Sequence, residues 1–143
     1  MPELPEVQTV VSELRKKIID KEIISVRVNL PKLIKNVSVS KFVDAICGTK
    51  IIKINRIGKN IIFDFNNGYS LISHLRMEGK YFFNFHHEDS VQKAHVIFNF
   101  VDAQLFYYDS RQFGTFYLYR SSDVASCKEI KKIGMDPLDK RFS

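Results

Sequence analysis

The chain has 143 residues, enough for one domain with a hydrophobic core and short for two. Its 22 Lys and Arg residues outnumber its 16 Asp and Glu residues, and the net charge of +6 favours a polyanionic partner, although solubility alone would also account for it. Cys47 and Cys127 are far apart in sequence, which favours buried reduced thiols over a disulfide or a metal site. We find no signal peptide or bilayer-spanning apolar run, and we expect a cytoplasmic protein.

The first predicted element is an amphipathic helix over residues 3–19. Its apolar residues follow helical spacing and form one stripe: Val7, Val10, Val11, Leu14 and Ile18. Pro2 and Glu3 suit the first turn of a helix, and lysines gather at the other end, where the helix dipole favours cations. We therefore expect the body of the helix to pack into the fold and its N-terminus, a favourable site for phosphate, to face a ligand.

Most of the remaining chain is predicted to form strands. Residues 24–30 alternate between apolar and polar side chains, which is typical of a half-buried strand. Ser38 or Ser40 is expected to cap a short helix that ends before Gly48. Seven further strands are predicted between turn-forming Gly, Asn and Asp residues: 51–56, 60–65, 70–77, 80–85, 95–100, 104–108 and 115–119. A last helix is expected over residues 122–131.

This order of elements predicts a mainly β fold with flanking helices. Short strands at such regular spacing are typical of an antiparallel sandwich or barrel. We predict an antiparallel β-sandwich of about eight strands, with an N-terminal α-helix that carries Pro2 and with a C-terminal helix. Residues 1–133 would form one domain, and residues 134–143 would begin a linker.

The start of the chain also has a chemical interpretation. Removal of Met1 would leave Pro2 with a free secondary amine, whereas an internal proline nitrogen is a non-basic amide. Such an amine can attack an aldehyde or an anomeric carbon to form a cationic iminium, as lysine does in Schiff-base enzymes. Glu3, beside it, could move the protons that ring opening and elimination require. Residue types alone leave both a helix start and a nucleophile open.

Residues 2–7, Pro-Glu-Leu-Pro-Glu-Val, resemble the N-terminal signature of bacterial formamidopyrimidine-DNA glycosylases, which remove oxidised purines from DNA. The resemblance implies that Pro2 forms a Schiff base with the sugar and that Glu3 protonates the sugar ring oxygen. It also implies that Glu6 helps to orient the helix N-terminus and that successive eliminations cut the strand on both sides of the lesion. The implied partner is damaged double-stranded DNA, bound by a monomer without membrane contact.

Two predicted turns gain a role from the same resemblance. Lys59 would ordinarily be a solvated turn residue, but the family has a lysine in this hairpin that reaches a DNA phosphate near the active site. In the stretch His-Leu-Arg-Met-Glu-Gly, Met77 would ordinarily fill an edge of the core. An unbranched, polarizable side chain also suits insertion into a base stack. The family's corresponding methionine fills the space of an everted nucleotide, and its histidine, here His74, contacts a phosphate.

The third stretch is Asp-Ser-Arg-Gln-Phe-Gly at residues 109–114. Arg111 would ordinarily be a surface charge and Phe113 a core aromatic, yet their spacing of two would point both side chains the same way in an extended loop. The family uses this loop to occupy DNA from which a base has been extruded: its arginine bonds the orphaned cytosine and its phenylalanine wedges the next step. Ser110 and Gln112 depart from the Pro and Arg that the family often has. We also place His95 among the implied DNA-binding residues.

The family's chains continue into a helix-two-turn-helix domain and a four-cysteine zinc finger, which this sequence lacks. We therefore expect an N-terminal catalytic domain that needs no metal or organic cofactor of its own. We also expect weak, salt-sensitive DNA binding and little or no turnover by this chain alone. Two alternatives stay open: a catalytically silent DNA-binding or interaction domain, and an endonuclease VIII-like glycosylase for oxidised pyrimidines. Leu4 argues against the second, because that branch usually has Gly there.

Overall fold

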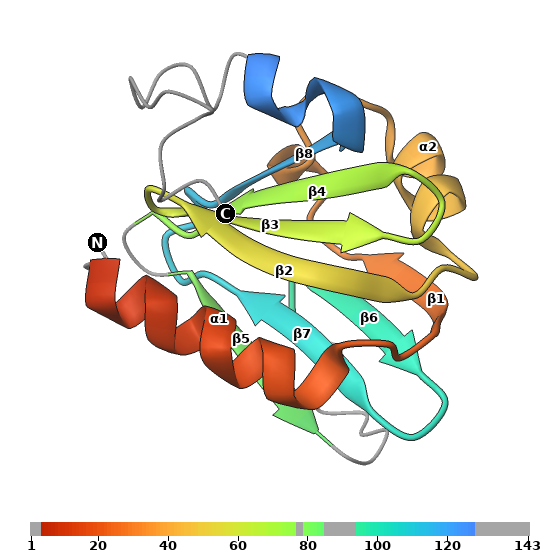
Figure 1. Ribbon diagram of the computed structural model, residues 1–143, viewed down its shortest axis with the longest axis horizontal. Coiled ribbons are helices and arrows are strands. Elements are labelled where there is room, and N and C mark those ends of the chain that lie inside the picture. Colours follow the sequence, from red (N-terminus) through yellow and green to blue (C-terminus); the bar gives the residue numbers. More distant parts are fainter. Residues whose placement is uncertain (1–3, 77–78, 85–93, 128–143) are drawn as a thin grey trace.

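The computed structural model describes residues 4–76, 79–84 and 94–127. Within these ranges the chain forms two four-stranded antiparallel sheets that pack face to face, with strand orders β1-β6-β7-β5 and β2-β3-β4-β8 (Figure 1). The elements are α1 (Leu4–Ile18), β1 (Ile23–Val28), the 3-10 helix η1 (Pro31–Leu33), α2 (Val39–Ile46), β2 (Ile51–Ile57), β3 (Asn60–Phe65), β4 (Tyr69–His74), β5 (Lys80–Asn84), β6 (Val96–Phe100), β7 (Gln104–Tyr108), β8 (Thr115–Arg120) and the 3-10 helix η3 (Ser121–Ser126). The predicted mainly β class and the eight-stranded sandwich are confirmed.

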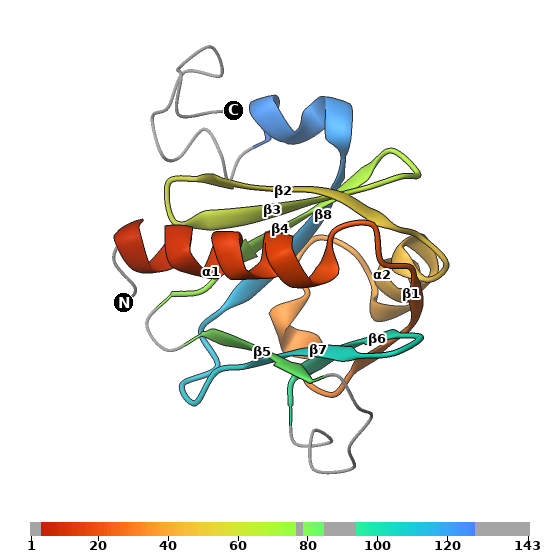
Figure 2. The same cartoon turned by 60° about the horizontal axis from the view of Figure 1, so that its bottom comes forward.

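Helix α1 closes one open side of the sandwich, between the edge strands β2 and β5 (Figure 2). Its predicted stripe packs in the main core: Val7, Val11 and Ile18 are completely inaccessible to solvent, Leu14 is buried, and Val10 is partly buried. Arg15 ties the helix to β2, because its Nε donates to the Ile54 carbonyl oxygen at 2.6 Å. The helix is therefore held along its whole body by packing and by hydrogen bonds, which fixes the direction of its N-terminus.

The opposite side of the sandwich is closed by the segment between β1 and α2. Ile34 forms an isolated parallel bridge with Phe116 of β8. Helix α2 follows, and the Ser38 side chain caps it by accepting a hydrogen bond from the Lys41 backbone N–H at 3.1 Å. Of the two predicted capping serines, Ser38 is the one that caps the helix.

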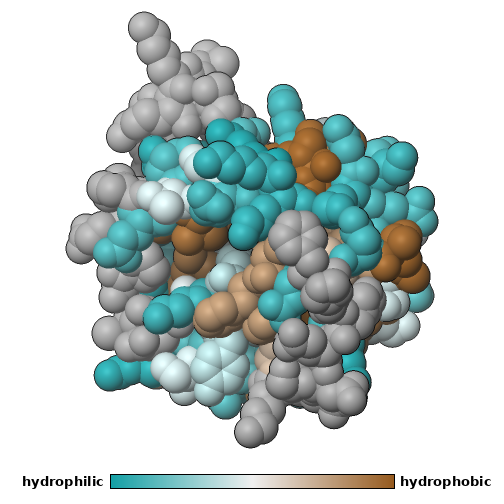
Figure 3. Space-filling view, turned by 90° about the horizontal axis from the view of Figure 1, so that it is seen from below, coloured by the Kyte–Doolittle hydropathy of each residue, from teal (hydrophilic) through white to brown (hydrophobic). Residues whose placement is uncertain are grey.

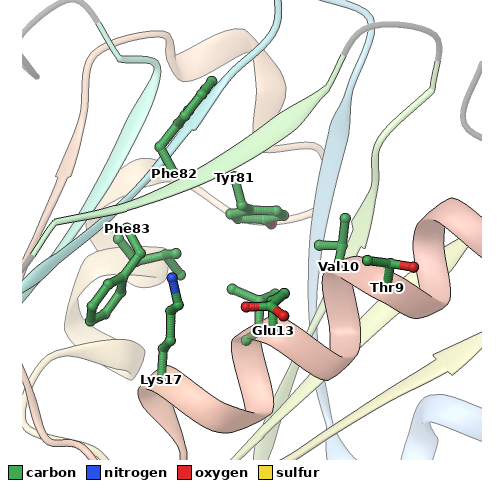
Figure 4. A pocket seen from close by; sticks show the side chains of 9 residues that line it. Thr9, Val10, Glu13, Lys17, Tyr81, Phe82 and Phe83 are labelled. Carbon is green, nitrogen blue, oxygen red and sulfur yellow. The ribbon is translucent and has the colours of Figure 1, made fainter.

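A pocket of about 250 Å³ lies between α1 and β5, lined mainly by apolar side chains (Figure 4). The Lys17 ammonium lies 5.3 Å from the centre of the Phe83 ring at one end of it. On the outer face of the same sheet, the half-exposed Phe82 stacks on Phe106 with a centroid distance of 5.4 Å. Figure 3, seen from the side of this sheet, shows apolar surface bordered by hydrophilic residues.

The predicted C-terminal α-helix over residues 122–131 is not seen in the part of the chain that the structure describes. Residues Ser121–Ser126 form a 3-10 helix instead. Its polar residues compete for backbone groups, as when the Ser126 hydroxyl donates to the Asp123 carbonyl at 3.2 Å, and this disfavours a continuous α-helix. Val124 and Cys127 anchor the segment on the outer face of the β2-β3-β4-β8 sheet. Residues 128–143, including the predicted linker, lie outside the described ranges.

Strand β4 is also shorter than predicted, since it ends at His74 and not at residue 77. Arg76 adopts a left-handed backbone conformation with φ of 58°, which turns the chain out of the sheet. The Gly79 N–H then closes the turn by donating to the Leu75 carbonyl at 3.0 Å. The chain therefore leaves the sheet directly after His74.

Candidate functional site

Three of the predicted site segments meet at one end of the β2-β3-β4-β8 sheet. The sheet register places Asn60 opposite His74 and His74 opposite Thr115. Lys59, in the turn just before Asn60, and the loop that ends at Thr115 therefore flank His74 on its two neighbouring strands. This arrangement of segments that are distant in sequence follows from the antiparallel pairing of β3, β4 and β8.

The first turn of α1 lies at the same end of the molecule. Arg56, at the end of β2, connects the two, because its Nε donates to Gln8 Oε1 at 3.1 Å and its Nη1 donates to the Gly58 carbonyl at 3.2 Å. Figures 1 and 2 both show the start of α1 on the side where the β2–β3 turn and the β7–β8 loop lie. Glu6 is exposed in this first turn. The predicted chemical residues, Pro2 and Glu3, lie outside the described residues.

The loop between β7 and β8 is built on the Asp109 carboxylate, which is completely buried. Four consecutive backbone N–H groups, those of residues 111 to 114, point at it. Oδ1 accepts from Arg111 N and Gln112 N, both at 3.1 Å, and Oδ2 accepts from Phe113 N at 3.0 Å and from Gly114 N at 2.7 Å. The Tyr107 hydroxyl also donates to Oδ2 at 3.3 Å. Hydrogen bonds to a buried carboxylate are stronger than neutral ones, so this loop is held in one conformation.

The two predicted inserting residues project from this loop. Arg111 is exposed, and 56% of the Phe113 surface is accessible to solvent. Gln112 between them has a φ of 59°, a conformation that costs free energy and persists here because the Asp109 hydrogen bonds hold it. The loop thus presents an aromatic ring and a guanidinium group on a rigid base. Single exposed hydrophobic residues are common on protein surfaces, so it is the position of Phe113 beside Arg111 on a rigid loop that makes the pair a candidate for ligand contact.

His74 is held in its neutral form. Burial lowers its pKa to about 4, and the positive charges of Arg76 and Lys59 act in the same direction. Its Nδ1 accepts a hydrogen bond from the Arg76 backbone N–H at 3.1 Å, so the ring proton is on Nε2. At neutral pH the ring therefore offers an uncharged N–H donor beside the ammonium of Lys59, which is half-buried.

His95 has a different position from the other predicted site residues. Its side chain is buried, stacks on Tyr108 with a centroid distance of 4.8 Å, and places Nε2 at 2.9 Å from the Asp109 carbonyl oxygen. Because a carbonyl oxygen only accepts, Nε2 is the donor. The ring therefore lies beneath the 109–114 loop and supports it from inside. Met77, the remaining predicted inserting residue, lies outside the described residues.

Sequence reasoning missed Asp109 and Tyr107 as organisers of the loop. An aspartate that begins a short loop ending in glycine is an Asx-type turn signal, and it could have indicated Asp109. Nothing local indicates that Tyr107, a strand residue two positions earlier, is completely buried and points its hydroxyl at that carboxylate.

Two other features are absent from the part of the chain that the structure describes. No helix there combines the length and the apolar composition needed to cross a bilayer. No three His, Cys, Asp or Glu side chains there converge into a cluster that could hold a metal ion.

Comparison with known proteins agrees with the geometry. The family model of the formamidopyrimidine-DNA glycosylase N-terminal domain matches residues 1–116. The chain is 44% identical over 145 residues to the formamidopyrimidine-DNA glycosylase of Mycoplasma pneumoniae and 43% identical over 145 residues to that of Ureaplasma parvum. Each match covers 100% of this chain and 52% or 53% of the relative, so the chain spans about half the length of the curated relatives it matches.

Solved structures give the same result. The structure superimposes on Lactococcus lactis Fpg in complex with DNA that contains an abasic site, with a TM-score of 0.81 and 38% sequence identity over 86% of this chain and 46% of that one. A complex of the same enzyme with DNA that contains N7-benzyl-Fapy-dG matches with a TM-score of 0.81 and 39% identity, over 86% of this chain and 45% of that one. The chain belongs to the formamidopyrimidine-DNA glycosylase family and corresponds to its N-terminal domain.

Proposed function

We propose that this chain is the lesion-recognition and catalytic domain of a bifunctional DNA glycosylase and AP lyase. Its substrates are oxidised purines such as 8-oxoguanine and formamidopyrimidines in double-stranded DNA. The observation that carries the proposal is the Asp109 loop, which presents Arg111 and Phe113 at the sheet end where His74, Lys59 and the start of α1 also lie. The similarity to an enzyme solved in complex with damaged DNA supports it.

Recognition depends on the residues around that sheet end. Phe113 wedges a base step and Arg111 bonds the base opposite the lesion through its guanidinium fork, while Met77 fills the space that the everted nucleotide leaves. Unstacking the lesion nucleotide costs a few kcal/mol, which these contacts offset. Lys59 contacts a backbone phosphate as a cation, and His74 contacts one as a neutral N–H donor. His95 acts indirectly, through the hydrogen bond that supports the loop.

The chemistry takes place at the chain start after Met1 has been removed. The Pro2 nitrogen attacks the anomeric carbon of the deoxyribose as the oxidised base leaves with the bonding electron pair. Glu3 protonates the ring oxygen, which opens the sugar and gives the iminium. The iminium acidifies the adjacent carbon, and successive β- and δ-eliminations expel the two phosphates. Glu6, in the first turn of α1, helps to orient the helix N-terminus. The sequence of steps requires no metal or organic cofactor in this chain.

The domain works as a monomer on DNA in the cytoplasm, and residues 1–133 form the catalytic unit, with 134–143 beginning a linker. The relatives are about twice as long, and their further length is expected to supply part of the DNA grip. This chain alone should therefore bind weakly, with strong salt dependence, and turn over slowly or not at all.

Borohydride trapping tests the chemistry. An intact-mass spectrum first establishes whether Met1 is present, and the protein is then incubated with an 8-oxoguanine duplex or an abasic duplex and reduced. We expect a covalent adduct only for protein that lacks Met1, a strongly reduced yield for Glu3→Gln and none with undamaged DNA. An adduct that forms with Met1 still attached contradicts the role of Pro2. Binding of damaged DNA without any adduct from the processed protein supports instead a silent DNA-binding domain.

Oxidised pyrimidines are the second candidate substrate. One similar structure is a complex between wild-type Lactococcus lactis Fpg and DNA that contains an oxidised pyrimidine, with a TM-score of 0.81 and 39% identity. Parallel trapping on 8-oxoguanine and oxidised-thymine duplexes separates the two. A higher adduct yield with 8-oxoguanine supports the purine assignment, and a higher yield with oxidised thymine supports the endonuclease VIII-like alternative.

A further inference from the structure

Two turns at the site contact the same buried hydroxyl group. A methyl group added at Gly79 would lie 2.4 Å from the Tyr107 hydroxyl oxygen, and one added at Gly114 would lie 1.8 Å from it. Each glycine is therefore in contact with this oxygen through its backbone. Gly79 closes the turn after β4, and Gly114 ends the loop before β8. The Tyr107 hydroxyl is thus placed between the two turns.

The position of this hydroxyl is itself fixed. The Tyr107 ring is completely buried and meets Tyr81 and Phe116 edge to face, with centroid distances of 5.2 Å and 5.0 Å. Its hydroxyl donates to Asp109 Oδ2 at 3.3 Å. Burial, together with the neighbouring Tyr81 and Asp109, raises the pKa of Tyr107, so the phenol keeps its proton and remains a donor.

Asp109 connects the Tyr107 hydroxyl to the 109–114 loop through shared hydrogen bonds. The same Oδ2 atom that accepts from Tyr107 also accepts from Phe113 N and Gly114 N. A displacement of the Tyr107 ring therefore changes the packing of Gly114 and the hydrogen bonding of the carboxylate at the same time.

The turn after β4 is tied to the same cluster. The Gly79 N–H donates to the carbonyl of the buried Leu75 at 3.0 Å, so the turn closes on itself with no room for a side chain at Gly79. Tyr81, which packs on Tyr107, shares a hydrogen bond of 2.6 Å with Ser73 Oγ in β4. Ser73 directly precedes His74. The aromatic cluster of Tyr81, Tyr107 and Phe116 therefore contacts β4, which ends at His74, and also Gly79, which follows that strand.

We propose that Tyr107 and Asp109 are positioning residues that couple Gly79 and the end of β4 to the 109–114 loop, so that His74, Arg111 and Phe113 reach DNA as one preformed surface. The coupling is a property of the free protein. Its consequence for DNA rests on the proposed function. A preformed surface loses less conformational entropy on binding than segments that move independently.

Amide hydrogen exchange, measured by NMR on the free protein, tests the coupling directly. Tyr107→Phe removes only the shared oxygen. We expect exchange at both the Gly79 and the Gly114 amides to become faster by about tenfold, the factor associated with losing a hydrogen bond to a buried carboxylate. Tyr119→Phe, on the same fold but outside the cluster, is the control and should leave both amides unchanged.

Asp109→Asn is the second variant, since an amide nitrogen cannot accept the hydrogen bonds that Oδ2 accepts. It should speed exchange at the amides of residues 111–114 and, through Tyr107, at Gly79. Faster exchange in the 109–114 loop with Gly79 unchanged in both variants would overturn the coupling, as would no change in either turn. Circular dichroism confirms that each variant is folded before exchange is interpreted.

Binding to DNA tests the consequence and separates it from the proposed function. For Tyr107→Phe we expect affinity for an abasic duplex to fall by about tenfold, with affinity for single-stranded abasic DNA unchanged, because only the duplex must be opened by inserted side chains. An equal loss on both DNAs indicates a merely structural role and overturns the positioning role. If the unaltered chain binds damaged duplex no more tightly than undamaged DNA, the proposed function fails. The exchange experiment still decides the coupling in that case.

Discussion

Replacing Gly114 by Ala should be among the most damaging small changes in this domain. The new methyl carbon would lie 1.8 Å from the Tyr107 hydroxyl oxygen and 2.8 Å from Cζ of the same ring. Van der Waals contact requires about 3.5 Å. The ring cannot move aside easily, because Tyr81 and Phe116 meet it edge to face. Overpacking of a close-packed interior costs about 1–3 kcal/mol, and we expect Gly114→Ala to reach the upper end. A loss of about 3 kcal/mol corresponds to a fall in Tm of about 10 °C for a chain of this length.

Thermal unfolding followed by circular dichroism, with urea denaturation in parallel, measures this effect. Gly68→Ala is the matched control: its φ is 86° and nothing lies within 4 Å of the added carbon, so it should lose only about 1 kcal/mol of backbone free energy. The double variant Tyr107→Phe with Gly114→Ala should recover part of the lost stability, because the closest obstacle is gone. A Tm for Gly114→Ala equal to that of the control, or strictly additive effects in the double variant, would refute the assignment of the clash to the hydroxyl.

Three further predictions concern exposed, titratable and capping residues. Arg111→Ala and Phe113→Ala should each keep the unfolding free energy within about 0.5 kcal/mol of the unaltered chain, because both side chains are exposed. Each should nevertheless reduce affinity for an abasic duplex by about tenfold, measured by fluorescence anisotropy. Unchanged affinity would contradict their insertion. The pKa of His74 is lowered from 6.5 to about 4, so the folded domain should lose stability as the pH falls from about 6.5 to 4, whereas above that window the ring is neutral in both states. A pKa shift of that size amounts to about 3 kcal/mol of stability at full burial, and solvent exposure of the half-buried ring reduces this to about 1 kcal/mol. His74→Gln should therefore flatten the pH dependence of the unfolding free energy measured in urea. An unaltered pH dependence would show that another group is responsible. Ser38→Ala should cost about 1 kcal/mol by removing the N-cap of α2, measured as a lower urea midpoint, with Ser40→Ala as a nearly neutral control.

The local elements were largely accessible from the sequence because their signals lie within a few residues. The apolar stripe of α1 and the alternation in the strands follow from geometry that repeats every 3.6 or 2 residues. The Ser38 cap of α2 follows from the residue type at one helix end. Two predictions were wrong. The end of β4 depends on a single left-handed residue, Arg76, and the predicted C-terminal helix is replaced by a 3-10 helix because polar side chains compete for the backbone. Neither effect alters the periodicity that precedes it.

The candidate site was accessible only in part. The resemblance of three short stretches predicted Lys59, His74, Arg111 and Phe113, and these residues lie at one end of one sheet or on the loop that leads into it. The protonation state of His74 is a different matter, because its neutral form comes from burial, from Arg76 in the same stretch and from Lys59 in the preceding hairpin.

By itself, the sequence determined the class of fold and the N-terminal helix, because hydrophobic periodicity and turn chemistry act over short distances. The stretches proposed to contact DNA were predicted from their resemblance to a known family. Only the tertiary structure decided that Tyr107, Asp109 and His95 form the buried base of the 109–114 loop, and that Gly79 shares that base. The reason is physical: these contacts join β4, β6, β7 and β8, and their strength depends on burial, which no single segment of the chain possesses before the two sheets pack together.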